Sequence, residues 1–220
     1  MAEWAVIFDV DGVLLDLTRD EEELFFTALS HFVPTENLSR DWNSYRIRND
    51  DDIIAEILER NMLPKNLKAE VIGHYLALLS QALEKSVKSI SIAGAEQLLS
   101  ALSGKTQLGI ATANLLRAAE LRLQQTGLWS HVSELAQGAD GGGHKSAILA
   151  QLLERVAVPR SNIIYIGDNL NDVEAGLLNN VHFIGFSTDG TRRNELKAHG
   201  ARHISENHME TFHIVRSLMT

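Results

Sequence analysis

Asp9 and Asp11, two carboxylates separated by one residue, are the side chains in this sequence best suited to chemistry. They follow an apolar run, residues 4–8, whose branched and aromatic side chains predict a buried strand, and they precede Gly12, which predicts a turn. In a parallel α/β sheet, ligands bind beyond the carboxyl ends of the strands, so we expect both acids at a binding site. The alternative is an acidic corner without chemistry, because Asp and Gly are common in turns.

The two acids need not have the same task. One carboxylate can attack an electrophile and form a covalent aspartyl intermediate, while the other transfers a proton to the leaving group. Because neighbouring carboxylates repel each other unless a cation or proton lies between them, we expect Mg²⁺, which prefers oxygen ligands, as a cofactor.

A second group of polar residues, Thr112-Ala113-Asn114, follows a predicted strand at 107–111. We call each such group of candidate site residues a polar station. The hydroxyl, the amide and the backbone N–H groups at a helix start could hold phosphate oxygens. The alternative is that Thr112 or Asn114 only caps the following helix.

A third and a fourth station involve Lys145 and a pair of acids, Asp168 and Asp172. Lys145 begins a helix behind three glycines, where the helix dipole disfavours a cation, so we expect a phosphate or an aspartate beside it. Asp168 and Asp172 can face the same way across one helical turn, Asp168 as a metal ligand and Asp172 orienting Lys145 or a metal-bound water. The alternatives are a solvated surface lysine and acids that cap a helix N-terminus.

The pattern of predicted elements indicates how these stations come together. Residues 19–89 carry apolar side chains at helical spacing, with helices expected at 21–32, 51–61 and 67–88. From Gly94 onward, helix and strand patterns alternate, which predicts a parallel sheet with helical crossovers. We expect an α/β fold with a three-layer, Rossmann-like core, residues 1–17 and 90–220, and an inserted all-helical cap, residues 18–89, that could cover the site. The expected later helices are 95–102, 115–126, 146–156, 173–178, 194–199 and one at the C-terminus; the expected strands are 107–111, 132–136, 162–166, 181–186 and 201–204.

Composition narrows the function classes. With 220 residues, 45% hydrophobic and 22% charged, the chain can bury one core domain and a small insert. A formal net charge of −9 argues against binding to nucleic acid or to an anionic membrane. The absence of cysteine excludes thiol chemistry, and no apolar run has membrane-spanning length. Together with the lack of a signal segment, this predicts a cytoplasmic protein that acts on a small molecule.

At these stations, and over nearly its whole length, the sequence resembles the haloacid dehalogenase (HAD) superfamily. Residues 8–14, Phe-Asp-Val-Asp-Gly-Val-Leu, resemble the first motif of that family, and the later stations resemble the second, third and fourth, at Thr112, Lys145 and residues 167–172. The resemblance implies that Asp9 is the nucleophile and Asp11 the general acid/base. It also implies a metal held by Asp9, the backbone carbonyl of Asp11 and Asp168, with Asp172 in support.

The insert is similar to the helical C1 cap of phosphoglycolate phosphatase-like and β-phosphoglucomutase-like members. In that resemblance Arg48 falls at a cap-loop lysine and could contact substrate, although Ile47 replaces the expected glycine and Arg46 is an equally available cation. Val13, Ala113 and Ser146 also differ from residues frequent in the family, which leaves the subfamily open.

The resemblance implies Mg²⁺-dependent hydrolysis of a small phosphorylated metabolite through an aspartyl-phosphate intermediate. Thr112, Ala113, Asn114 and Lys145 would bind the phosphate. The alternatives are a phosphomutase of the β-phosphoglucomutase type, or a catalytically silent binding or regulatory protein. Dehalogenation is disfavoured because the dehalogenases lack an acid at the position of Asp11.

Overall fold

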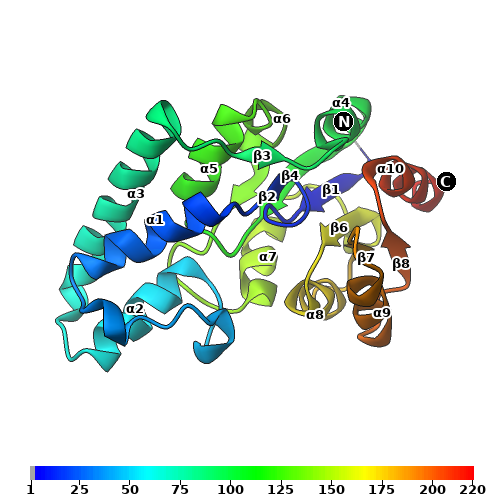
Figure 1. Ribbon diagram of the computed structural model, residues 1–220. Helices are drawn as coiled ribbons and strands as arrows, with labels where there is room; N and C mark the ends of the chain where they lie inside the picture. The colour runs from blue at the N-terminus through cyan, green and yellow to red at the C-terminus, as the bar shows by residue number, and fades with distance from the viewer. Residues whose placement is uncertain (1–2) are drawn as a thin grey trace.

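A computed structural model of the protein describes residues 3–220 and has a six-stranded parallel sheet at its centre (Figure 1). The strand order is β5-β4-β1-β6-β7-β8, and all neighbouring strands are parallel. The bounds are β1 Ala5–Phe8, β4 Gln107–Ala111, β5 Ala136–Gln137, β6 Ile163–Gly167, β7 His182–Phe186 and β8 His203–Ser205.

Helices cover both faces of this sheet, so its central strands are fully buried. Because side chains alternate along a strand, Val6 and Phe8 of β1 enter one hydrophobic cluster while Ala5 and Ile7 enter another on the opposite face. The first face is covered by α4 Ala95–Leu102, α5 Leu116–Gln125, α6 Trp129–Val132 and α10 His208–Leu218. The second is covered by α7 Lys145–Leu153, α8 Leu170–Leu178 and α9 Gly190–Ala198. The predicted three-layer α/β core is confirmed.

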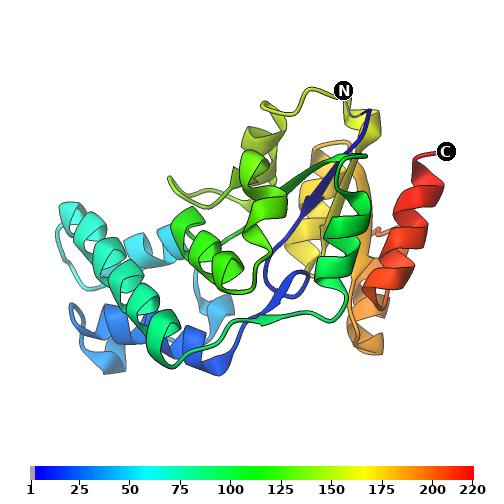
Figure 2. The same cartoon turned by 90° about the horizontal axis from the view of Figure 1, so that it is seen from above.

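Three further helices, α1 Arg19–Ser30, α2 Asp50–Arg60 and α3 Lys68–Lys85, lie together to one side of this core (Figures 1 and 2). They share a third hydrophobic cluster, in which Phe25 of α1 meets Tyr75 of α3 edge to face at a ring-centroid distance of 5.2 Å. Leu115 and Ala118 of the core also belong to this cluster. The division into a core of residues 1–17 and 90–220 and a cap of residues 18–89 stays a prediction.

The chain reaches and leaves these three helices through a two-stranded antiparallel ribbon, β2 Leu15–Asp16 and β3 Ile90–Ser91. The sequence analysis missed both strands, because two residues are too short to show any periodicity. The strand expected at 132–136 is wrong in its first part: α6 and a short helical turn, Ser133–Leu135, come before β5.

The predicted helix at 95–102 and strand at 107–111 agree with the structure to the residue. α8 and α9 begin three to four residues before their predicted starts, because Asn169 and Asp189 cap them and were not recognised as caps. Within residues 3–220, no helix combines the length and the apolar character that crossing a membrane requires.

Candidate active site

Asp9 lies at the carboxyl end of β1, between the ends of β4 and β6. Its backbone N–H still donates to the carbonyl of Ile166 at 2.8 Å, so the residue is fixed by the sheet. Phe8 pairs with Ile110 on one side and with Ile166 on the other. Residues that follow β4 and β6 are therefore brought beside Asp9, at the edge where parallel sheets bind their ligands.

Gly12 makes the turn after the two acids. Its φ is +78°, a left-handed conformation that favours glycine. A Cβ at this position would also lie 2.2 Å from Oδ2 of Asp168. The glycine thus lets the loop after β1 approach the carboxylate that follows β6.

Lys145, the first residue of α7, is buried, with 6% of its surface exposed. Its Nζ lies 2.6 Å from Oδ1 of Asp9 and 3.2 Å from Oδ1 of Asp172. Burial works to lower the pKa of Lys145, but Asp172 and Asp9 outweigh it and raise the pKa above its usual value. The structure therefore places an ammonium group against Asp9 and excludes a solvated surface lysine.

Asp172 is fully buried and makes hydrogen bonds through both oxygens. Oδ1 accepts from the Tyr165 hydroxyl at 2.6 Å, and Oδ2 accepts from the backbone N–H of Asn169 at 3.0 Å. Asp172 therefore caps α8 and holds Lys145 at the same time, so the two roles considered for it are both present in the geometry.

The carboxylates of Asp9, Asp168 and Asp172 each have an oxygen within 4.8 Å of the other two. Burial raises the pKa of Asp9 well above its usual value, and Asp172 and Asp168 add to the effect while Lys145 opposes it. Burial, followed by Asp172, also raises the pKa of Asp168 to about 7, again against Lys145. This crowding of negative charge favours a bound cation.

The donor set fits a hard divalent cation. Oδ2 of Asp9 and the carboxylate of Asp168 accept no hydrogen bond from any other residue within 3–220. Three carboxylates and one ammonium leave a formal charge of −2. Carboxylate oxygens are the ligands that Mg²⁺ and similar ions prefer, whereas Asp172 is already occupied by its hydrogen bonds.

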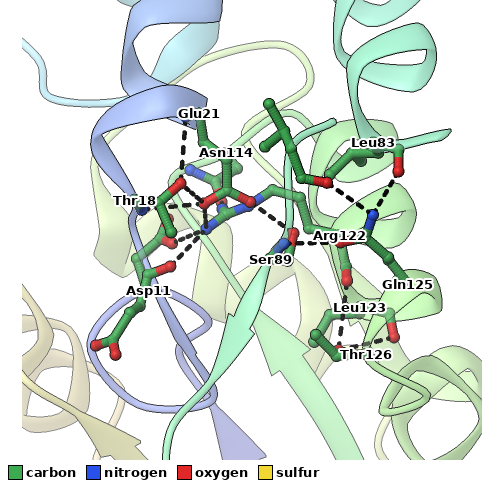
Figure 3. A network of polar contacts seen from close by, with 12 residues as sticks. Asp11, Thr18, Glu21, Leu83, Ser89, Asn114, Arg122, Leu123, Gln125 and Thr126 are labelled. Atoms are coloured by element: carbon green, nitrogen blue, oxygen red, sulfur yellow. Dashed lines mark hydrogen bonds and ion pairs between the residues drawn. The ribbon is translucent and has the colours of Figure 1, made fainter. Parts of the chain in front are cut away.

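Asp11 points away from this cluster and toward α5. Its Oδ1 accepts a hydrogen bond of 2.6 Å from Nη2 of Arg122, which also pairs with Glu21 (Figure 3). The sequence analysis missed both Arg122 and Glu21, because each lies within a helical pattern and not at a strand end. A signal was available: Arg122 occupies the stripe of α5 that Ala118, Ala119 and Leu123 otherwise make apolar.

Thr112, Ala113 and Asn114 follow β4, as predicted, and neither polar side chain caps α5. Oγ1 of Thr112 accepts from the backbone N–H of Asn114, and Oδ1 of Asn114 accepts from Arg122. The backbone N–H groups of Leu115 and Leu116, at the start of α5, instead donate to Oδ2 of Asp50 and Oδ2 of Asp140. The capping alternative is therefore not realised, and the hydroxyl and amide remain at the site.

A cavity of about 390 Å³ opens over these residues. Among the predicted site residues it is lined by Asp9, Asp11, Gly12, Arg48, Thr112, Ala113, Asn114, Lys145 and Asp168. Arg46 lies outside it and pairs with Glu56 and Glu59, and Asp172 lies behind it. The other lining residues include some that the sequence analysis did not single out, among them Trp42, Asp50, Tyr75, Asn169 and Asn171.

The sequence pattern of haloacid dehalogenase-like hydrolases matches residues 6–186, so the chain belongs to that family, as predicted. No curated protein matches this sequence. A predicted phosphatase from Clostridium acetobutylicum has a similar structure, with a TM-score of 0.72, 22% identity, and coverage of 99% of this chain and 100% of that one.

Two other solved structures share the fold. A β-phosphoglucomutase-like protein from Thermotoga maritima has a TM-score of 0.63 and 22% identity, covering 97% of this chain and 99% of that one. A HAD family hydrolase from Deinococcus radiodurans, with bound phosphate and sodium, has a TM-score of 0.63 and 19% identity, covering 100% of this chain and 98% of that one. At these identities the likeness concerns the fold.

Proposed function

We propose that the protein is a Mg²⁺-dependent phosphatase that hydrolyses a phosphate monoester of a small metabolite through an aspartyl-phosphate at Asp9. The observation that carries the proposal is the placement of Asp9: its carboxylate contacts Lys145 at 2.6 Å and shares a cavity with Thr112 and Asp168. Family membership makes the protein a hydrolase, and this side-chain set suits phosphoryl transfer.

In the proposed first step, a carboxylate oxygen of Asp9 forms a bond to phosphorus while the bond from phosphorus to the leaving oxygen breaks. Asp11 donates its proton to that oxygen, and the alcohol departs. Lys145, the Thr112 hydroxyl, the backbone N–H of Ala113 and the side-chain amide of Asn114 hold the phosphate oxygens.

In the proposed second step, Asp11 takes a proton from water as the water oxygen attacks phosphorus. The bond to Asp9 breaks and phosphate leaves. Asp9, the backbone carbonyl of Asp11 and Asp168 would hold Mg²⁺, which would offset negative charge on the phosphoryl group. Asp172 supports this arrangement by holding Lys145.

We further propose that residues 18–89 act as a cap whose side chains select the leaving group, and that the protein works in the cytoplasm. Supporting the cap, Arg48, Phe25, Trp42 and Tyr75 line the same cavity as Asp9. Arg48 makes no ion pair within residues 3–220, so it is available to an anionic part of the substrate.

A phosphomutase is the second candidate, because a β-phosphoglucomutase-like protein shares this fold and because aromatic cap residues line the cavity, which would help to exclude water. The two activities differ in the acceptor of the phosphoryl group, water or a sugar hydroxyl. Incubation with sugar phosphates followed by product analysis separates inorganic phosphate from an isomeric sugar phosphate.

The test of the proposed function is a panel of phosphorylated metabolites assayed for phosphate release, with Mg²⁺ and with a chelator. We expect Mg²⁺-dependent turnover of at least one member. Asp9→Asn, which removes the nucleophile but keeps the shape of the side chain, is expected to abolish turnover and to retain the wild-type circular dichroism spectrum. Appreciable phosphate release by Asp9→Asn would reject the assignment of Asp9.

A further inference from the structure

Arg122 is a cation buried between the core and the helical insert. Only 2% of its surface is exposed, although it reaches the wall of the cavity. Burial works to lower its pKa, but Asp11 and Glu21 more than compensate and raise the pKa above its usual value. Arg122 is therefore a permanent positive charge at this place.

The guanidinium group of Arg122 is held on three sides. Nη2 donates to Oδ1 of Asp11 at 2.6 Å, Nε donates to Oε1 of Glu21 at 2.9 Å, and Nη1 donates to Oδ1 of Asn114 at 3.2 Å (Figure 3). Because the guanidinium is planar and rigid, three such partners fix its position and its tilt. The position of Oδ1 of Asp11 is fixed with it.

Glu21, which anchors Arg122 from α1, is itself fully bonded. Its Oε2 accepts from the backbone N–H and the hydroxyl of Thr18, and its Oε1 accepts from the hydroxyl of Ser89 at 2.6 Å. Thr18 and Ser89 lie just beyond β2 and just before β3, the two connections to the helical insert. The orientation of Arg122 thus depends on both connections.

Asp11, by contrast, has one oxygen engaged and one available. Arg122 donates to Oδ1, whereas Oδ2 accepts no hydrogen bond from any residue in the described chain. A carboxylate held at one oxygen cannot rotate freely, so its other oxygen keeps a defined direction at the wall of the cavity.

We infer that Arg122 is a positioning residue for Asp11, and that Glu21 is the anchor that keeps Arg122 in place. The inference rests on the proposed function. Arg122 holds Oδ1, and Oδ2 exchanges the proton: it gives the proton to the leaving oxygen as the P–O bond breaks, and it takes one from water as water attacks the aspartyl-phosphate at Asp9.

The test uses Arg122→Met, with Arg117→Met as a matched control on the same helix. Arg117 is exposed and pairs with Glu120 at the surface, so Arg117→Met is expected to keep wild-type kinetics. p-Nitrophenyl phosphate is the first substrate, because p-nitrophenolate leaves without needing a proton. Rapid mixing then separates release of the first p-nitrophenolate from steady-state turnover.

For Arg122→Met we expect a burst approaching one equivalent of p-nitrophenolate per enzyme, followed by a steady state about 10- to 100-fold slower than wild type, with KM lowered along with kcat so that kcat/KM changes little. Attack by Asp9 on this substrate does not need the acid, whereas water attack needs the base. With an alkyl phosphate, whose alcohol must be protonated, the burst is expected to disappear and the first turnover to slow as well.

Removing Arg122 alone leaves two carboxylates facing each other, which destabilises a buried site. The double variant Glu21→Gln with Arg122→Met removes both charges and keeps the proposal testable; it is expected to show the same burst. Arg122→Lys, which keeps the charge but not the three-sided hold, is expected to recover part of the steady-state rate.

Wild-type kinetics in Arg122→Met and the double variant would overturn the inference, and so would an equal loss of the first turnover and the steady state with both substrates. In either case an active wild type leaves the proposed function standing. A wild type inert toward every phosphate ester would overturn both.

Discussion

Gly12 meets two requirements that no other residue type meets together. Its φ of +78° is strained for any residue with a Cβ, and the space that a Cβ would need is taken by the carboxylate of Asp168. Gly127 has almost the same φ, +79°, but nothing lies within 4 Å of its Cβ position. Comparing substitutions at Gly12 and Gly127 therefore separates the effect of backbone strain from the effect of contact with Asp168.

Gly12→Ala and Gly127→Ala are each expected to lose about 1 kcal/mol of unfolding free energy through the backbone. Only Gly12→Ala is expected also to lose activity, at least about 10-fold, because Asp168 must move away from its place beside Asp9. Denaturant unfolding and phosphatase assays on both variants measure the two effects. Equal activity per folded molecule would show that Asp168 does not need this close approach.

The residues of the site divide into those that a sequence pattern can reveal and those that it cannot. Asp9, Thr112 and Asp168 each follow a buried strand, and the order of parallel strands brings such positions to one edge. Arg122 comes from the middle of a helix, and its meeting with Asp11, 111 residues away in sequence, depends on how α5 packs. No local sequence pattern predicts a contact between residues so far apart in the chain.

Among the secondary-structure elements, α2 is bonded to the core through its first residues. The backbone N–H of Asp50 donates to the carbonyl of Ala113 at 3.0 Å, and its Oδ2 accepts from the N–H of Leu115 at 2.9 Å, at the start of α5. Two residues on, Oδ2 of Asp52 accepts from the N–H of Gly143, just before α7. These bonds hold the insert over the cavity.

Asp50→Asn gives a pH-dependent prediction. Burial raises the pKa of Asp50 to about 7, against the bond from Leu115, whereas the unfolded value is near 3.8. A raised carboxyl pKa favours the folded state at low pH, so the wild type loses stability as pH rises from about 4 to 7. The Asn variant lacks this loss.

The stability of Asp50→Asn relative to wild type is therefore expected to be greater at pH 8 than at pH 5, by about 1–2 kcal/mol once partial exposure is allowed for. Thermal melts at the two pH values measure it. Asp140→Asn, an exposed carboxyl that bonds the neighbouring N–H of Leu116, is the control. A difference of the opposite sign for Asp50→Asn would contradict the burial of this carboxyl.

At the scale of the whole molecule, the central sheet was predicted better than the contacts that connect the helical insert to the core. Mostly apolar runs such as 107–111 and 162–166 become strands that are buried on both faces, and this character is visible locally in the sequence; the predicted sheet is confirmed. β2, β3 and the contacts of Asp50 are connections of this kind. Each needs a partner distant in sequence, so neither periodicity nor propensity reveals it.

Metal binding should be visible in the stability of the entire chain. At a Mg²⁺ concentration about 100-fold above its Kd, binding to the folded state alone adds ~2.7 kcal/mol, which raises Tm by several degrees in a chain of this size. Because Asp168, with a pKa of about 7, must be deprotonated to bind, the rise in Tm is expected to be larger at pH 8 than at pH 6.

Differential scanning fluorimetry of chelator-treated protein, with and without Mg²⁺, measures this rise. Asp168→Asn is expected to lose most of it, whereas Asp140→Asn, away from the acidic cluster, should retain it. An equal rise in Asp168→Asn would place the cation elsewhere.

The ribbon of β2 and β3 also offers a place at which the insert could be removed or replaced by protein engineering. Asp16 pairs with Ile90, so the chain departs and returns at adjacent residues, and a tight hairpin turn could link them without disturbing the sheet order. Such a miniature would uncover Leu115 and Ala118 and leave Arg122 without Glu21. The insert can therefore be exchanged as a cassette only if its replacement supplies an apolar surface and a carboxylate at those two places.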